Sequence, residues 1–425
     1  MQDADLAPPT NSLLRRILVS ALLATLIGLL SGSASALFLT ALDWVTALRW
    51  AHPGLVYGMP LAGILTLYVY QRFGAQSDRG NALILEKIHL PGGGVPRRMA
   101  PLILASTLIS HLCGASVGRE GTAVQMGGSL ASAVAHALRL APSRLPHLLI
   151  AGIAGGFGSV FGTPLAGAMF AIEVPTRGRL QVAAAFPALI ASFVGDATCR
   201  AWGVAHTAYP LLESGHSLPP TSLSLLAKIG LAAVLFGLAG AAFVKLHHAT
   251  QRSLQKHVAL SWLRPCIGAG IILLLSHLLG NRDYLGLSVA SPNPASVTLQ
   301  TTFCAGGATP WSWLWKLLLT ALSLGSGFKG GEVTPLFFIG AALGNTLATL
   351  LNAPLPLLAA LGFLAVFCGS AHTPIAGALL GIELFGTDGA LFFLIACLVS
   401  HWSCGSTPLY STQRRAEDTP HQAGR

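Results

Sequence analysis

The chain has 425 residues, of which 53% are hydrophobic and only 9% are charged, and its mean hydropathy is +0.65. Soluble domains carry about 25% charged residues, so this composition excludes an ordinary water-soluble protein and predicts a polytopic membrane protein. The net charge of +10 comes from basic residues scattered through short loops and tails, with no basic surface interleaved with aromatic residues, which argues against nucleic-acid binding.

The first long apolar run, residues 17–42, directly follows Arg15 and Arg16. A cleavable signal peptide is the alternative interpretation, because the small residues at 31–36 offer cleavage sites. However, the run is longer than the roughly 7–15 apolar residues of a signal peptide and continues past those small residues. Because Lys and Arg favour the cytoplasmic side, we expect residues 1–14 to form a cytoplasmic N-terminal tail.

Further apolar segments recur along nearly the whole chain. Several are shorter than the roughly 20 residues that cross a bilayer, and Gly or Pro interrupts many of them. Segments of this kind indicate discontinuous helices that meet near the middle of the membrane, where transporters build their ion sites. The segments fall at about 17–48, 54–71, 100–114, 122–138, 146–172, 182–198, 223–247, 265–279, 310–325, 333–351, 355–368 and 373–400.

The polar stretch 206–222 divides the chain into two halves, at about 15–205 and 223–413. Together they are predicted to form one transmembrane transport domain, 15–413. The tail 414–425 begins with two arginines and is therefore expected in the cytoplasm. No Walker-type phosphate loop occurs, which excludes ATP-driven transport by this chain. The seven cysteines form no CxxC pair, so the sequence supports neither a metal site nor a disulfide framework.

The two halves repeat each other in sequence. GTPLAGAMFAIE at 162–173 matches HTPIAGALLGIE at 372–383, and GREGT at 118–122 matches GGEVT at 330–334 at nearly the same offset. Internal duplication is therefore indicated. Residue identity does not say whether the halves are inverted in the membrane, but transporter precedent favours inversion.

The repeat pairs two acids, Glu120 and Glu332, and each opens an apolar stretch behind glycines, where a helix would begin. A charge inside a membrane costs at least ~2.5 kcal/mol on insertion scales, so an acid there usually marks a function. The start of a helix has free amide N–H groups and a partial positive charge, which suit either a carboxylate or a free anion. Each Glu could simply cap its own helix. Two repeat-related acids in apolar sequence favour a glutamate that competes with a transported anion and leaves when it is protonated.

These motifs, GREGT, the TPLAG helix and GGEVTP, resemble the CLC family of anion channels and transporters over about residues 15–413. The resemblance implies an all-α fold of two inverted structural repeats with broken and tilted helices. It also implies a homodimer with one pore per subunit, and no cofactor. By resemblance, Glu120 is the gating glutamate, which swings between the anion path and the outside. Gly121 and Thr122 beside it are candidate anion ligands.

The first departure from the chloride-handling pattern concerns the segment GSGIP, whose serine binds the central anion in most members. The corresponding stretch is interpreted as GNALI at 80–84, which puts Asn81 at the serine position. The alternative, PGGGVP at 91–96, looks more like GSGIP, but Arg97 and Arg98 follow it and would start a buried helix poorly. We interpret it as a loop, because GNALILEKIH runs straight into a helical pattern.

Two further departures point away from chloride. The GxFxP motif of the chloride branch is GEVTP here, at 331–335, with Glu332 at the variable position and Val333 in place of Phe. Where chloride–proton exchangers carry an inner proton-relay glutamate, this chain has Val174. The combination resembles the CLC-F clade, the bacterial fluoride–proton antiporters that protect against environmental fluoride. In that clade the GEVTP glutamate faces the anion path, and Val333 and Thr334 would shape the fluoride site.

The chemistry of the residues agrees with fluoride, which is small and strongly hydrated and needs several hydrogen-bond donors to replace its water. Thr334, Asn81, Tyr410 and helix-start N–H groups are suitable donors. Tyr410, in STPLYSTQ, resembles the pore tyrosine of the family, although an interfacial aromatic is the alternative. Protonated Glu120 would couple the fluxes by accepting a proton outside, swinging inward and exchanging places with outgoing fluoride.

Several other polar residues receive lesser roles. Arg119 is expected to brace its loop, and Glu173 and Glu383, at the ends of apolar stretches, to be structural or interfacial. His372 is expected to be a packed histidine rather than a proton relay, and Lys329 receives no role.

The sequence thus predicts a fluoride–proton antiporter in the inner membrane of a bacterium, with both termini cytoplasmic, that exports fluoride for fluoride resistance. A CLC-type chloride channel or chloride–proton exchanger is the alternative, and GEVTP counts against it. An intramembrane enzyme is disfavoured, although GSGF at 325–328 resembles a serine-protease motif, because no HExxH occurs and no histidine is placed to serve as the base of Ser326. A non-transporting scaffold would have no function to retain two buried acids.

Overall fold

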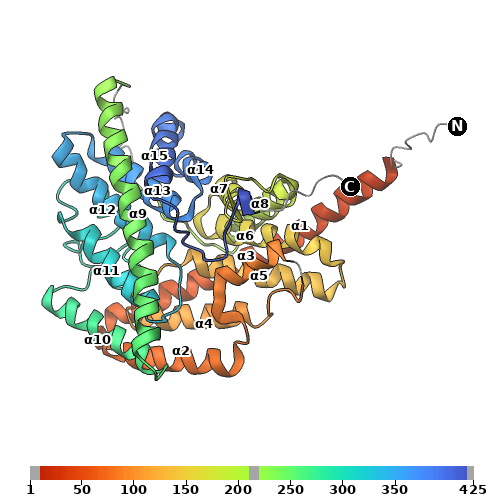
Figure 1. Cartoon of the computed structure of the whole chain (residues 1–425), viewed down its shortest axis with the longest axis horizontal. Coiled ribbons are helices and arrows are strands. Elements are labelled where there is room, and N and C mark those ends of the chain that lie inside the picture. The colour runs from red at the N-terminus through yellow and green to blue at the C-terminus, as the bar shows by residue number, and fades with distance from the viewer. Residues whose placement is uncertain (1–9, 91, 210–219, 419–425) are drawn as a thin grey trace.

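The structure is a computed structural model, and it describes residues 10–90, 92–209 and 220–418. The described chain is predominantly helical, which confirms the predicted all-α class (Figure 1). The first helix begins at Thr10 and so includes the end of the predicted N-terminal tail. Parts of both predicted tails and of the polar join lie outside the described residues.

Each half contributes a similar series of helices. The first half contains α1 (Thr10–Ala51), α2 (Met59–Phe73), α3 (Gly80–His89), α4 (Met99–Leu112), α5 (Glu120–Ala137), α6 (Leu145–Phe161), α7 (Pro164–Glu173) and α8 (Ala185–Ala201). The second half contains α9 (Leu223–His257), α10 (Leu263–Leu278), α11 (Ser312–Gly325), α12 (Val333–Leu351), α13 (Leu355–Ala371), α14 (Pro374–Phe385) and α15 (Ala390–Ser403). Two short strands, β1 (Thr176–Arg177) and β2 (Arg414–Arg415), pair in parallel.

Six helical stretches of the described chain are long and apolar enough to cross a membrane. Two of them, Pro142–Phe161 and Val333–Leu351, are largely buried inside the protein, whereas the others keep apolar side chains on the surface, as lipid contact requires. The remaining apolar helices are shorter. The six stretches are Leu13–Ala51, Pro53–Phe73, Pro142–Phe161, Val182–Ala201, Leu223–His257 and Val333–Leu351.

The two halves use the same packing scheme. Helix α5 packs on α6 as α12 packs on α13, and α1 packs on α8 as α9 packs on α15. Both central pairs cross where glycines face each other. A Cβ on Gly127 would lie 2.0 Å from the carbonyl oxygen of Gly152, and one on Gly340 would lie 1.9 Å from that of Gly362. The absence of side chains at these crossings lets the backbones touch, a common device in membrane helix packing.

Two apolar segments that composition presents as continuous are each broken into two helices. The segment 146–172 divides between α6 and α7 at Gly162, which has a left-handed φ of +73°, and Pro164 starts the new helix. The segment 373–400 divides between α14 and α15 at Gly386, with φ +93°. Left-handed residues end helices and Pro suits only their first turn, so local conformation overrides the continuous hydrophobicity.

The halves cap each other where α7 packs on α14. The carboxylate of Glu173, at the end of α7, accepts N–H groups of Ile375 and Ala376 at the start of α14. In the same way, Glu383 on α14 accepts N–H groups of Leu165 and Ala166 at the start of α7. These reciprocal bonds satisfy helix-start donors and place both glutamates in structural roles.

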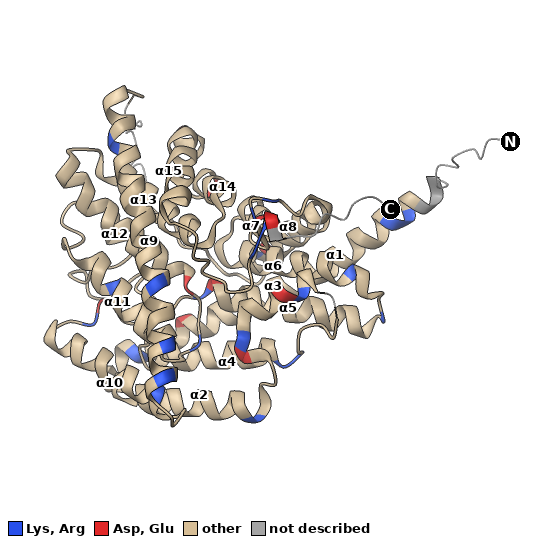
Figure 2. Ribbon diagram, viewed as in Figure 1, with Lys and Arg blue, Asp and Glu red and all other residues tan. Residues whose placement is uncertain are grey.

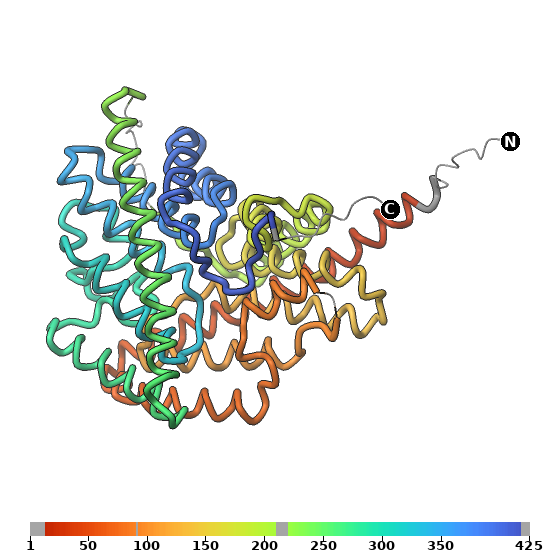
Figure 3. The backbone as a smooth tube through the Cα atoms, viewed as in Figure 1, coloured from red at the N-terminus to blue at the C-terminus, as the bar shows by residue number. Residues whose placement is uncertain are grey.

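After α15 the chain returns between the two halves as a non-helical strap, residues 404–413, which is drawn in dark blue in Figure 3. Arg177 holds its beginning by donating to the carbonyl oxygens of Gly405 and Ser406. The pairing of β1 with β2 fixes its end. The strap carries Tyr410, which is buried among the central helices.

Candidate ion-binding site

The two glycine-rich motifs meet back to back at the centre of the protein. Gly118 and Gly331 form an antiparallel bridge in which each N–H donates to the other carbonyl, at 2.5 Å and 2.7 Å. Immediately after this bridge, α5 begins at Glu120 and α12 begins at Val333. The pairing therefore brings the starts of two helices, and both repeat-related glutamates, into one place.

The carboxylate of Glu120 lies at the start of the helix in the other half. It is completely buried, and its Oε2 accepts the backbone N–H of Thr334 at 3.0 Å and the Thr334 hydroxyl. Arg119 donates to the same carboxylate through its backbone N–H and its Nε, the latter at 3.2 Å. A carboxylate thus occupies a set of donors at a helix start that would equally suit a free anion.

The carboxylate of Glu332 lies on the other side of the same contact. A Cβ on Gly121 would lie 2.9 Å from the Cα of Gly331, 3.3 Å from Oε2 of Glu332 and 3.4 Å from Nδ2 of Asn81. The lack of a side chain at Gly121 therefore lets this carboxylate and this amide approach the start of α5. The Tyr410 phenol and the Asn81 amide both interact with Glu332.

The second group of polar residues, formed by Glu332, Asn81 and Tyr410, retains free acceptor atoms. Oε1 of Glu332 and Oδ1 of Asn81 are buried and have no hydrogen-bond partner among the described residues. A protonated Glu332 would turn its carboxylate into a donor as well as an acceptor. Glu332 and Asn81 can therefore accept a proton or a hydrogen bond from a new partner without first losing an existing one.

The remaining predicted ligands lie nearby in different settings. Val333 is buried in the first turn of α12, beside Thr334. The hydroxyl of Thr122 pairs with that of Thr107 on α4, at 2.8 Å, and so is already engaged. Helix α3 begins at Gly80, and the stretch 92–98 is not helical. Both observations agree with the interpretation of GNALI at 80–84 as the counterpart of GSGIP and of PGGGVP at 91–96 as a loop.

A cavity of about 760 Å³ leads to this second group. Asn81, Glu332 and Tyr410 line it, whereas Glu120 does not. Basic side chains outnumber acidic ones among the described residues that line the cavity. The acids are Asp78 and Glu332. The basic and titratable nitrogen side chains are Arg79, Lys245, His247, His248, Arg252 and Lys329.

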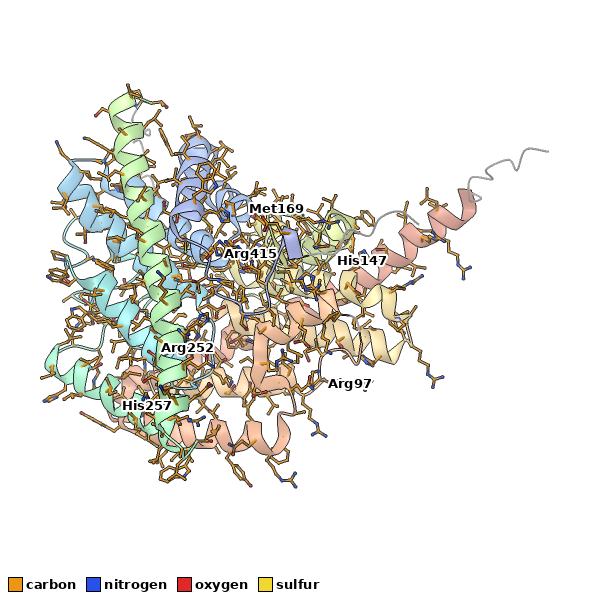
Figure 4. All side chains as sticks on the ribbon, in the orientation of Figure 1. Arg97, His147, Met169, Arg252, His257 and Arg415 are labelled. Atoms are coloured by element: carbon orange, nitrogen blue, oxygen red, sulfur yellow. The ribbon has the colours of Figure 1, made fainter. Side chains whose placement is uncertain are left out.

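The basic residues of α9 are concentrated near the end of the helix that closes the cavity. Figure 2 shows blue segments along this part of α9, and Figure 4 labels Arg252 and His257 there. Such a positive cavity attracts anions and raises their local concentration. The cavity is lined by basic side chains and reaches Glu332, whereas Glu120 is buried and does not line it.

Sequence reasoning left Lys329 without a role and did not consider Lys245 or Gln125. Lys329 lines the cavity, and its ammonium group lies 4.6 Å from the centre of the Tyr70 ring. Gln125 on α5 also lines the cavity, with its amide against Gly80. The sequence signal that could have identified these cavity-lining residues is a basic or amide side chain within an otherwise apolar run.

The other assigned residues lie as follows. Arg119 contacts its neighbour Glu120, as expected for a residue that braces the loop. His372 is buried and faces His401, with 3.3 Å between their Nδ1 atoms. The described residues contain no group of three or more His, Cys, Asp or Glu side chains that could hold a metal ion.

The chain is similar to known anion-transport proteins over most of its length. A "Chloride/fluoride channel protein" of Pseudomonas syringae pv. tomato is 44% identical over 406 residues, which cover 94% of this chain and 87% of that protein. The "H(+)/Cl(-) exchange transporter ClcA" of Vibrio vulnificus is 26% identical, over 94% of this chain and 92% of that protein.

A solved structure described as a CLC-type fluoride/proton antiporter superposes with a TM-score of 0.87, at 32% identity, over 94% of this chain and 98% of the other. A slow cyanobacterial Cl⁻/H⁺ antiporter shares the fold, with a TM-score of 0.75 at 20% identity. Residues 62–405 match the family described as voltage gated chloride channel. The chain therefore belongs to the CLC family of voltage gated chloride channels and related transporters.

Proposed function

We propose that this protein is a fluoride–proton antiporter that exports fluoride from the bacterial cytoplasm in exchange for protons. The observation that carries the proposal is the position of Glu332. It stands at the variable position of a motif that departs from the chloride type, and it lies at the inner end of a basic cavity, next to Asn81 and Tyr410. The Pseudomonas relative is described as a chloride/fluoride channel protein and the superposed structure as a fluoride/proton antiporter. Both descriptions support fluoride as the substrate.

The mechanism begins with anion entry through the basic cavity. Fluoride loses part of its hydration there only if the protein supplies other donors. Asn81 Nδ2, the Tyr410 hydroxyl and a protonated Glu332 are the donors available at the end of the cavity. A chloride ion is larger and needs fewer strong donors, so a site rich in short polar groups favours fluoride.

Coupling follows from competition between Glu120 and fluoride. While it is ionised, the Glu120 carboxylate holds both donors of Thr334 and closes the path. Protonation removes its charge and weakens its charge-assisted hydrogen bonds, so the side chain leaves and fluoride takes the vacated donors. The movement of a protonated Glu120 in one direction and of fluoride in the other exchanges the two ions.

We also propose that the protein is a homodimer in the inner membrane with both termini in the cytoplasm. Large apolar side chains are exposed on the four helices α7, α8, α14 and α15, including Leu165, Phe193, Leu391 and Trp402. Exposed apolar area of this kind suits a second copy or lipid. Chemical cross-linking in native membranes, followed by measurement of the cross-linked mass, tests the dimer.

The substrate proposal is tested with purified protein in liposomes loaded with equal concentrations of fluoride and chloride. Ion-selective electrodes follow the efflux of each ion, and a pH electrode follows proton uptake, after valinomycin is added so that potassium balances the charge. The proposal requires fluoride efflux at least tenfold faster than chloride efflux, with proton uptake that accompanies fluoride. Comparable efflux of the two ions would instead favour a chloride exchanger or channel.

A further inference from the structure

A second polar cavity, of about 410 Å³, lies away from the site described above. It is enclosed by the end of α1, the turn Pro53–Gly58 that follows it, and the segment 280–298 between α10 and α11. Its lining contains Arg49, Arg282 and a series of small polar side chains. Neither the repeat motifs nor the transport mechanism uses this cavity.

Arg49 is the central feature of the cavity. It is only 8% exposed, yet no acidic side chain and no hydrogen-bond acceptor among the described residues pairs with its guanidinium group. Two glycines bracket this group. A Cβ on Gly286 would lie 2.3 Å from Nη1 of Arg49, and one on Gly114 would lie 3.5 Å from the same atom. The backbone therefore makes room for the guanidinium group of Arg49, which lines the cavity.

A buried lysine supports the wall of the cavity. Lys316 on α11 is fully buried, and its Nζ donates to the carbonyl oxygens of Tyr284 and Gly286 and to the hydroxyl of Ser288, at 2.8–3.1 Å. Ser288 has a left-handed φ of +55°, which is uncommon for a residue with a side chain. The loop is thus folded around the Lys316 amino group, which has no carboxylate partner in the described chain.

The mouth of the cavity carries a second arginine and one acid. Arg282 is held by the carbonyl oxygen of Pro53 and lies against the ring of Tyr57. Its positive charge is close enough to repel that of Arg49. Asp283 also lines the cavity, but its Oδ2 accepts the backbone N–H of Val297 at 2.9 Å. Among the described residues that line the cavity, two arginines outweigh this single carboxylate.

We propose that this cavity binds a small, weakly hydrated monovalent anion, such as chloride, bromide or nitrate, between Arg49 and Arg282. A buried positive charge without a partner is costly, and a bound anion would supply the missing partner. A guanidinium group is itself weakly hydrated and therefore suits such anions better than it suits fluoride. The volume accommodates the ion together with several waters.

This site is separate from the predicted transport path but connected to it through the backbone. The segment from Gly114, which borders Arg49, runs directly to Gly118 and Glu120. An anion at Arg49 would therefore lie at one end of the segment that positions the gating glutamate. The proposal does not depend on which anion the protein transports.

The direct test is anomalous diffraction from crystals grown with sodium bromide. The wild-type protein is expected to show a bromide peak within hydrogen-bonding distance of the Arg49 guanidinium. Arg49→Gln is expected to lose this peak, and Lys245→Gln, in the other cavity, to keep it. A wild-type map without the peak, or an equal peak in Arg49→Gln, would overturn the assignment.

A solution measurement excludes binding that occurs only at crystal concentrations. The thermal unfolding temperature is measured as sodium bromide replaces sodium gluconate at constant ionic strength. We expect a saturable rise in the wild type, a bromide Kd at least tenfold weaker in Arg49→Gln, and a several-fold weaker Kd in Arg282→Gln. Arg282 is exposed, so its substitution tests the site even if Arg49→Gln does not fold. An equal rise in wild type and Arg282→Gln, with no saturation, would contradict the proposal.

Discussion

The hydroxyl of Thr334 provides the sharpest test of the idea that Glu120 and the transported anion compete for the same donors. Thr334→Val removes this hydroxyl and preserves both the size of the side chain and the backbone N–H, which donates to Glu120 at 3.0 Å. A hydrogen bond to a charged group contributes about 1.5–3 kcal/mol. Because each 1.4 kcal/mol is a factor of ten, the loss corresponds to a roughly 10- to 100-fold weaker hold on a bound anion.

The measurement uses the Glu120→Ala background, in which the donors are free for the ion, and follows fluoride binding by titration calorimetry. Thr334→Val is expected to weaken the fluoride Kd about 10- to 100-fold in this background. Thr122→Val is the matched control. Its hydroxyl pairs with Thr107 rather than with Glu120, so its effect on the Kd is expected to be below about threefold. A change below twofold in Thr334→Val would refute the shared-donor explanation.

Three further substitutions test other parts of the site and the fold. Glu332→Gln keeps the shape of the side chain but removes its titration, so proton-coupled fluoride exchange in liposomes should fall at least tenfold while the elution volume of the protein stays unchanged. Gly121→Ala places a Cβ 2.9 Å from the Cα of Gly331 and should reduce fluoride exchange by a similar factor, whereas exchange near wild-type rates would contradict the close packing. Glu173→Gln weakens a carboxylate cap on the start of α14 and should destabilise the protein by about 2 kcal/mol, measured as a lower unfolding temperature with fluoride selectivity retained.

The sequence was sufficient to predict the fold class and the duplication, and it singled out the two glutamates that the fold brings together, because each of these leaves a local signal. Charged residues are rare in apolar sequence, so Glu120 and Glu332 are conspicuous, and glycines before an apolar run mark the start of a helix. The helix starts at Gly80, Glu120 and Val333 follow from such signals. The helix boundaries at Gly162 and Gly386 could not be predicted in this way, because the apolar sequence continues across each break.

Contacts between the halves could not be predicted, because they depend on how the two repeats pack. Nothing near Thr334 in the sequence indicates that its hydroxyl binds the Glu120 carboxylate of the other half. The same is true of the reciprocal caps made by Glu173 and Glu383. Arg49 and Lys316 also come together only in the folded protein, since they are far apart in the chain.

A proton gradient alone decides whether proton movement drives fluoride through Glu120. Liposomes contain equal fluoride inside and outside, and the outside is made acidic. Protein-free vesicles measure the leak of HF. Wild-type protein is expected to move fluoride outward against its developing gradient as protons enter, and Glu120→Gln is expected not to. Fluoride movement that does not depend on the pH gradient, or equal movement in Glu120→Gln, would contradict proton coupling through Glu120.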